Sequence, residues 1–231
     1  MDATENETPS TATGYTTLAA GGDFRHELSI KRSRFITVLR RVEDEAAARA
    51  LVAELRREFY DARHHCTAFV LGPDQSVQRS NDDGEPSGTA GIPMLEALTK
   101  HRTADGTALS DISAVVVRYF GGILLGAGGL VRAYSESVSA ALDAAPLVAR
   151  RRLGLFTVSL PHAAAARLEN DLRSAGYAMT GNGYDAAQTH IGIALPDEPA
   201  TIEAARQRLA SLTAGAAGLE PAGTDWVDLP G

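Results

Sequence analysis

The sequence predicts an α+β protein of two domains, because strand-like and helix-like segments alternate along the chain and its charge balance changes once. Its 231 residues suffice for two domains, each long enough to bury a core. Residues 1–152 carry 18 basic and 20 acidic side chains, whereas residues 153–231 carry 4 and 9. We expect a first domain over 23–149 and a second over 153–231, with the basic triplet 150–152 as an exposed linker.

The first domain is expected to follow a tail and to open with a β-hairpin. Residues 1–22 are rich in Thr, Ala, Gly and acidic residues and can bury little apolar surface, so they are expected to be disordered. Frequent β-branched residues over 24–42 indicate two strands. Acidic residues at 43–45 favour a helix N-terminus, and apolar residues at helical spacing extend that helix to about Tyr60.

The rest of the first domain mixes strands, loops and helices. The expected elements are a strand over 66–71, a turn over 72–74, a strand over 76–79, a polar loop over 80–88, a helix over 90–101, a buried strand over 112–120, a glycine-rich loop over 121–129 and a helix over 130–145. Thr89 is the expected N-cap of the helix that follows the polar loop.

The second domain shows the order strand–helix–strand–strand–helix–strand, which is typical of the split-βαβ, ferredoxin-like fold. Its expected elements are strands over 153–160, 177–184, 189–195 and 219–229, with helices over 162–175 and 199–214.

Composition narrows the class of protein. Cys66 is the single cysteine, so no intrachain disulfide can form, which agrees with a reducing cytoplasm. The acidic N-terminus lacks the apolar stretch of a secretory signal. The apolar run 112–131 contains several glycines and one charged residue, Arg118. Insertion of an Arg at the centre of a bilayer costs roughly 2.5–3.5 kcal/mol. We therefore expect a cytoplasmic protein without a membrane segment.

An acidic loop over 80–91 is the first candidate site. Asp82, Asp83 and Glu85 lie within four positions, and their oxygen atoms could hold a divalent cation. Their spacing does not fit a calcium-binding loop, which needs acids or amides at alternating positions and a distant Glu. The alternative is a solvated turn with helix caps, and no metal is assigned.

A glycine-rich loop between Arg118 and Arg132 is the second candidate site. A buried strand, a glycine loop and a helix start can direct backbone N–H groups at an anion. Neither the dinucleotide fingerprint nor the P-loop fits, because Val131 stands where the first needs a third glycine and no Gly-Lys-Ser/Thr follows. The alternative is a tight loop in which the glycines only permit positive φ and close packing.

Two further patterns are weaker. His64, His65 and Cys66 suggest a metal or thiol site, but zinc needs about four ligands, so we expect a buried and unreactive Cys66. The basic stretch 31–41 could meet RNA phosphates or an acidic partner. If that stretch is a strand, Arg32 and Arg34 point the same way, although charges on a solvated strand edge would look the same.

Four motifs occur in a fixed order along the first domain. They are Lys-Arg-Ser-Arg-Phe-Ile from 31, His64 with Cys66, Ser-Asn-Asp-Asp-Gly-Glu-Pro-Ser-Gly-Thr-Ala-Gly from 80, and Val-Arg-Tyr-Phe-Gly-Gly-Ile from 117 with its continuation to Tyr134. Together they closely resemble the IMPACT family, and its bacterial YigZ-like branch in particular, over about residues 24–145. His65 stands where many members have Asn, and Leu124 where many have Lys, so one positive charge is missing beside the glycine loop.

The resemblance implies a role in the control of translation. It also implies a first domain similar to the second domain of a small-subunit ribosomal protein and to domain IV of elongation factor G. The second domain would be ferredoxin-like, similar to the last domain of that factor.

We expect a binding protein, without a cofactor, that contacts the ribosome, RNA or a translation factor; neither a membrane nor DNA is expected as a partner. The candidate binding residues are Arg32, Arg34, Asp82, Asp83, Glu85, Arg118, Gly121, Gly122, Gly126, Gly128, Gly129 and Arg132. Arg118 should pair with Asp83 or Glu85, because an unpaired buried charge is costly, and the two loops should lie side by side. The alternative is an enzyme that acts on a phosphorylated small molecule through the glycine loop, with Asp83, Glu85 or His64 as candidate catalytic residues.

Overall fold

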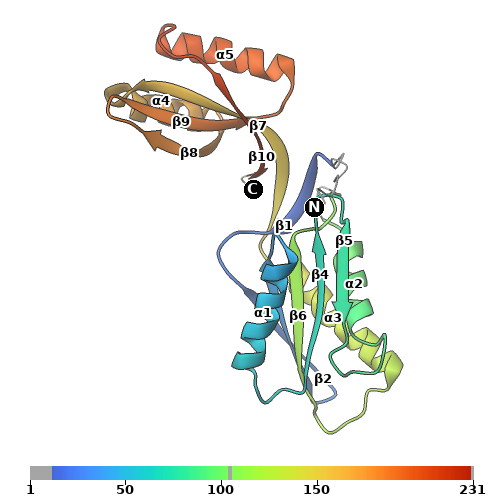
Figure 1. Cartoon of the computed structure of the whole chain (residues 1–231). Coiled ribbons are helices and arrows are strands. Elements are labelled where there is room, and N and C mark those ends of the chain that lie inside the picture. Colours follow the sequence, from blue (N-terminus) through green and yellow to red (C-terminus); the bar gives the residue numbers. More distant parts are fainter. Residues whose placement is uncertain (1–11, 104–105, 230–231) are drawn as a thin grey trace, which may run out of the picture. The chain divides into compact units, whose positions relative to one another are not determined.

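The computed structural model describes residues 12–103 and 106–229 (Figure 1). The chain divides into two compact units, Met1–Ala149 and Arg150–Gly231. Helices and mostly antiparallel strands occur in both, which confirms the α+β class. Within the described part of the chain, no helix is long and apolar enough to cross a membrane.

The first unit is built on a five-stranded antiparallel sheet in the order β2-β3-β6-β4-β5. Its elements are β1 (Gly14–Leu18), β2 (Phe24–Ile30), β3 (Ser33–Arg41), α1 (Glu45–Glu58), β4 (His64–Leu71), β5 (Val77–Asn81), α2 (Gly91–Lys100), β6 (Ile112–Tyr119) and α3 (Ala127–Ala144). Helix α1 covers one face of this sheet, and α2 and α3 cover the other (Figure 1).

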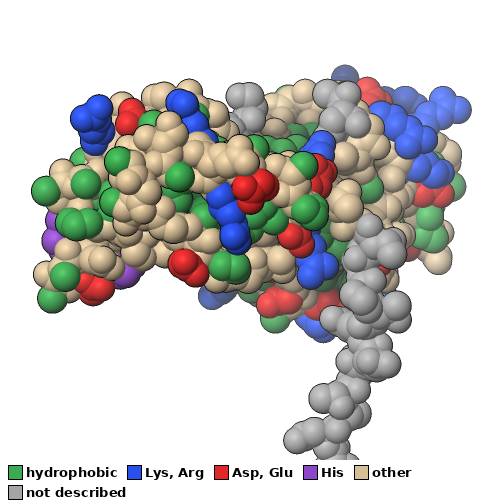
Figure 2. Space-filling model, turned by 90° about the horizontal axis from the view of Figure 1, so that it is seen from above, with side chains coloured by type: hydrophobic (Ala, Val, Ile, Leu, Met, Phe, Trp, Pro, Cys, Tyr) green, Lys and Arg blue, Asp and Glu red, His purple; other side chains and the backbone are tan. Residues whose placement is uncertain are grey.

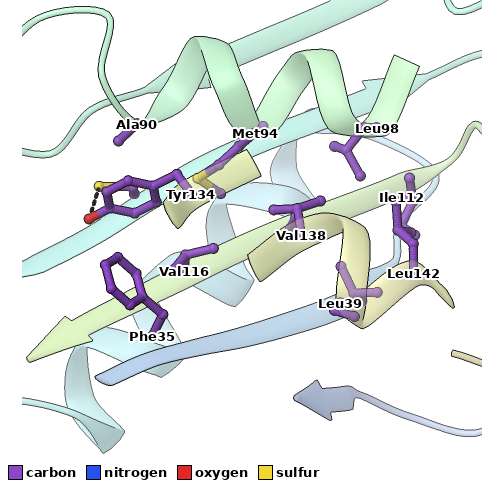
Figure 3. Packing of buried hydrophobic residues seen from close by; sticks show 14 of the residues in the cluster. Phe35, Leu39, Ala90, Met94, Leu98, Ile112, Val116, Tyr134, Val138 and Leu142 are labelled. Carbon is purple, nitrogen blue, oxygen red and sulfur yellow. Dashed lines mark hydrogen bonds between the residues drawn. The ribbon is translucent and has the colours of Figure 1, made fainter. Parts of the chain in front are cut away.

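Alternation along the central strands explains the two buried faces. On β3, Phe35 and Leu39 pack against α2 and α3, while Ile36 and Val38 pack against α1. Figure 3 shows the first of these layers, in which Met94 from α2 and Tyr134 from α3 lie over the sheet. Since both faces are covered, the central strand β6 is apolar over almost its whole length, as expected for a doubly covered strand.

The expectation of disorder over residues 1–22 is wrong for part of this range. Residues 14–18 form strand β1, in which Tyr15 and Leu18 are fully buried. The Tyr15 hydroxyl donates to the Asp111 carboxylate, and Thr16 forms a parallel bridge with Leu109. A few apolar residues suffice here because distant parts of the chain supply their partners. Residues 1–11 of the expected tail lie outside the described residues.

Two helix starts differ from the sequence-based expectation. Helix α2 has Ala90 at its N-cap, and the Thr89 hydroxyl donates instead to the Pro86 carbonyl oxygen at 2.6 Å. Helix α3 begins at Ala127 rather than at residue 130, so Gly128 and Gly129 belong to its first turn.

The second unit contains a sheet in the order β10-β7-β9-β8, with antiparallel neighbours throughout. Its elements are β7 (Leu147–Pro161), α4 (His162–Ser174), β8 (Ala178–Tyr184), β9 (Gln188–Leu195), α5 (Pro199–Thr213) and β10 (Glu220–Asp228). Phe156, Val158 and Leu160 of β7 share one core with both helices, so α4 and α5 cover the same face of this sheet.

The expected linker at 150–152 is part of a strand. Strand β7 begins at Leu147, within the first unit, and Arg150, Arg151 and Arg152 pair with Asp228, Val227 and Trp226 of β10. The Arg150 guanidinium also lies 2.9 Å from the Asp228 carboxylate. The basic triplet 150–152 is therefore a paired strand segment and not an exposed linker.

Candidate functional site

One end of the first unit collects most of the candidate residues. The antiparallel register places the start of β3, the start of β4 and the end of β6 together, since Arg118 lies opposite both Phe35 and His64. The β2–β3 turn, the acidic loop 82–88 and the glycine loop 121–126 lie at this end, the lower end of the first unit in Figure 1. We call it the loop end.

A buried ion pair joins the acidic loop to the sheet. The Arg118 guanidinium lies 2.6 Å from the Glu85 carboxylate, and the two side chains are only 7% and 4% exposed. The Tyr134 hydroxyl donates to the same Glu85 oxygen at 2.8 Å. The expected pairing of Arg118 with a carboxylate of this loop is therefore confirmed. Because this pair is buried, Glu85 can offer little of its carboxylate to a ligand.

Asp82, and not the expected Thr89, caps the start of helix α2. Its carboxylate accepts hydrogen bonds from the backbone N–H groups of Gly88, Ala90 and Gly91 at 2.7–3.0 Å. Burial alone would raise the pKa of Asp82, but these three bonds outweigh it and leave the pKa below its ordinary value. The Asp82 carboxylate oxygens are thus used to hold the start of α2 rather than to bind a cation.

Asp83 is also engaged by its own chain. Its carboxylate contacts the Arg56 guanidinium at 2.5 Å and accepts from the His65 backbone N–H at 2.6 Å. His64 Nδ1 lies 2.9 Å from the Asp83 carbonyl oxygen. The three residues considered as catalytic groups, His64, Asp83 and Glu85, all take part in fixing this loop.

His65 and Cys66 lie behind the loop and are buried. Desolvation lowers the pKa of His65, which favours its neutral form at neutral pH. Burial raises the pKa of the Cys66 thiol to about 12, so the sulfur stays protonated. The expectation of a buried Cys66 is confirmed; its sulfur lies 3.0 Å from the Asp82 carbonyl oxygen and 3.3 Å from the Tyr134 hydroxyl. Among the described residues, no three His, Cys, Asp or Glu side chains form a metal-binding group.

The glycine loop lies against the turn between β2 and β3. The Gly121 N–H lies 3.2 Å from the Ser33 hydroxyl oxygen. A side chain at Gly121 would collide with the Arg32 backbone, because a Cβ there would come within 2.0 Å of the Arg32 carbonyl carbon. The loop and the turn are therefore in direct contact.

The turn itself has an unusual backbone for its residues. Ile30 pairs with Ser33, which leaves Lys31 and Arg32 as a two-residue turn with φ values of 47° and 67°. Such turns favour Asn and Gly, since other side chains are strained at positive φ. The expectation that Arg32 shares a strand face with Arg34 is wrong, because Arg32 precedes β3.

The cations of the first unit fall into two groups. Arg34 binds the Glu27 carboxylate through two bonds of 2.9 Å, and Arg25, Arg40, Arg49 and Arg56 also have carboxylate partners. Figure 2 shows acidic and basic side chains beside one another at several places on the face that it draws, and a gathering of basic side chains at its upper right. In contrast, Lys31, Arg32 and Arg132 are exposed and, like Arg57, Arg63 and Arg102, form no ion pair within 12–103 and 106–229.

The candidate residues therefore separate into a buried or half-buried network and an exposed surface, and Arg34, which pairs with Glu27, belongs to neither. The network contains Asp82, Asp83, Glu85 and Arg118. The exposed surface contains Lys31, Arg32, Arg132 and the glycine loop. Sequence reasoning missed Tyr134, the second partner of Glu85, and Phe120, which is 53% exposed at the end of a buried strand. The sequence does contain a signal for an exposed Phe120. This aromatic residue stands at the end of the expected strand, directly before two glycines, so no further strand residue follows to cover it.

Comparison with known proteins relates the chain to a single family. A family model described as the Impact N-terminal domain matches residues 31–142. "IMPACT family member YvyE" of Bacillus subtilis (strain 168) is 43% identical over 165 residues, which are 71% of this chain and 72% of that protein. "IMPACT family member YigZ" of Escherichia coli (strain K12) is 55% identical over 115 residues, about half of each chain.

A solved structure is similar to the chain over most of its length. A crystal structure described as that of a hypothetical protein is 36% identical, has a TM-score of 0.56, and covers 90% of this chain and 97% of its own.

Proposed function

Because the chain belongs to the IMPACT family, we propose that it acts in the control of translation by binding RNA at the loop end of its first unit. The observation that carries this proposal is the turn formed by Lys31 and Arg32. Two exposed cations, without ion pairs to the described residues, occupy backbone positions that favour Asn and Gly. Residues at positive φ cost of order 1–3 kcal/mol each and are found preferentially at functional sites.

The setting of the turn suits a phosphate backbone. Arg32 lies directly against Gly121, and the helix α3 that follows this loop has a glycine N-cap without a side-chain hydrogen bond. Within the described residues, no side chain caps the first turn of α3, so the backbone N–H groups that end this loop are left for another acceptor. Arg132, on the same helix, adds a third exposed positive charge.

The absence of a positive charge at Leu124 limits the size of this patch. With Lys31, Arg32 and Arg132 as its principal charges, the surface would neutralise only a few phosphates. Binding of that kind is weak at physiological salt and depends steeply on ionic strength. We expect the RNA contact to add to other contacts on a larger assembly such as the ribosome.

We assign the second unit to the ferredoxin-like fold. Its element order is that of a split βαβ unit, and both helices lie on one face of a four-stranded antiparallel arrangement. The similarity of the first unit to translation proteins, which the sequence motifs imply, is part of the same proposal.

The experiment uses a variant that removes the charges and keeps the turn. Lys31→Asn combined with Arg32→Gly places the residues that this turn favours, so the fold should be retained. We expect weaker binding to a fluorescent single-stranded RNA oligonucleotide of 12 nucleotides. If both cations contact phosphates, the slope of log affinity against log salt should become less steep by about 1.4.

The matched control is Arg206→Gln combined with Arg208→Gln on helix α5, which removes the same amount of charge from the second unit. This control should bind RNA as the unchanged protein does. Equal losses in both double variants would mean that net charge alone governs binding. No loss in the turn variant would reject the proposed surface.

A further inference from the structure

Phe120 is held at the loop end in an unusual way. It follows the last residue of β6, is 53% exposed, and its ring centroid lies 5.8 Å from the Arg118 guanidinium carbon. The same guanidinium lies 5.5 Å from the centroid of the buried Phe35 ring. Arg118 therefore contacts one buried ring and one exposed ring.

The support beneath Phe120 is rigid. Glu85 fixes the Arg118 guanidinium, and Phe35 packs edge-to-face on Tyr134 with ring centroids 5.3 Å apart. Cation–π contacts of this kind favour a defined distance between ring and charge. The exposed ring of Phe120 thus has a preferred orientation, unlike a freely rotating surface side chain.

The neighbours of Phe120 are the parts of the proposed RNA surface. Gly121, the next residue, touches the backbone of Arg32, so the backbone that carries the ring is in direct contact with the cationic turn. Ile123 and Leu124 in the same loop are also exposed, Leu124 by 84%. A large apolar surface beside exposed cations fits bases that are exposed together with their phosphates, as in a single strand.

Building on the proposed function, we propose that the surface binds single-stranded RNA and that one unpaired base stacks on the ring of Phe120. Base–aromatic stacking needs a flat ring and tolerates any base, so sequence preference should be small. Duplex RNA offers phosphates without free bases, and should gain nothing from Phe120.

The test compares Phe120→Leu, Phe120→Trp and the unchanged protein with one purified RNA oligonucleotide in single-stranded and duplex form. We expect Phe120→Leu to lose roughly 5- to 150-fold in affinity for the single strand and nothing for the duplex. Phe120→Trp should retain affinity, and, with Trp226→Phe removing the only other tryptophan, its fluorescence should be quenched by the single strand. Tyr184→Leu in the second unit is the matched control for loss of an exposed aromatic side chain, since Tyr184 is 71% exposed, and thermal unfolding checks that each variant is folded.

The outcomes separate this inference from the proposed function. If the unchanged protein binds single-stranded RNA and Phe120→Leu binds it equally well, the stacking proposal is overturned, and an apolar role toward a protein partner fits the ring better. Equal losses for Phe120→Leu and Tyr184→Leu would also overturn it, because the position of the ring would then not matter. If the unchanged protein binds neither form of RNA at any salt concentration, both proposals fail.

Discussion

At the residue scale, Arg118 has two separate tasks. Its guanidinium neutralises the buried Glu85 carboxylate, and it lies beneath the exposed ring of Phe120. The pairing with a nearby acid could be anticipated, because an Arg in an otherwise apolar strand is costly without a partner. The contacts with Phe35 and Tyr134 could not, since they depend on which helix covers that strand.

Replacing Arg118 should therefore damage the fold first. Arg118→Ala leaves Glu85 buried without its counter-charge, which typically costs about 3–5 kcal/mol of unfolding free energy. Equilibrium unfolding in urea, with the unchanged protein as reference, measures this loss. Arg132→Ala removes an exposed Arg without an ion pair in the described chain, and should change stability by less than about 0.5 kcal/mol.

A double variant makes this prediction sharper. Arg118→Met with Glu85→Leu removes both charges together, and should lose less stability than Arg118→Ala because no buried charge is left alone. An Arg118→Ala protein as stable as the unchanged one would show that water or a rearranged loop compensates the Glu85 carboxylate.

At the scale of elements, most strands and helices begin and end within a few residues of their expected positions. Alternating burial on β3 and helical spacing on α1 are local patterns, and local patterns can be predicted. Strand β1 was missed because its partners lie near residue 109 and at Pro146. The start of α2 was assigned to the wrong cap because the real acceptor, Asp82, lies eight residues before the capped Ala90.

The glycines of α3 give a prediction in which stability and binding change in opposite directions. A Cβ added at Gly128 meets nothing within 4 Å, and this residue has ordinary helical φ. Gly128→Ala should therefore raise unfolding free energy by up to about 1 kcal/mol. It should weaken RNA binding, because the added methyl group stands beside the exposed N–H groups of the first helical turn.

Gly126→Ala is the matched control for this prediction. Its surroundings are equally open, but its φ of 72° strains any other residue, so this variant should be less stable than the unchanged protein. Thermal unfolding and RNA titration of the two variants test both statements. Unchanged RNA affinity in a stabilised Gly128→Ala protein would remove the start of α3 from the proposed surface.

At the scale of the whole molecule, the two units are connected through strand β7. The chain divides into its two units after Ala149, and the residues that follow this point are paired rather than free. Composition cannot tell an unpaired linker from a strand, because both expose charged side chains.

Limited proteolysis distinguishes these two cases. Trypsin needs an extended, unpaired segment, and Arg151 and Arg152 expose their side chains while their residues pair with Val227 and Trp226. We expect the native protein to resist early cleavage at 150–152. Mass spectrometry of the fragments over time measures where the chain is cut. The same sites should be cut quickly in urea, and rapid cleavage there in the native protein would mean that β7 and β10 separate readily.

Strand β1 has a consequence for the order in which the chain can fold during its synthesis. The Ala19 N–H donates to the Pro146 carbonyl oxygen at 2.8 Å, and Thr16 is bonded to the backbone at 108 and 110. These partners leave the ribosome long after β1 itself. Until residue 146 has emerged, one edge of β1 is unpaired and its buried Tyr15 and Leu18 lack their final surroundings. The first segment of the sheet-forming chain to be made is therefore among the last to be completed.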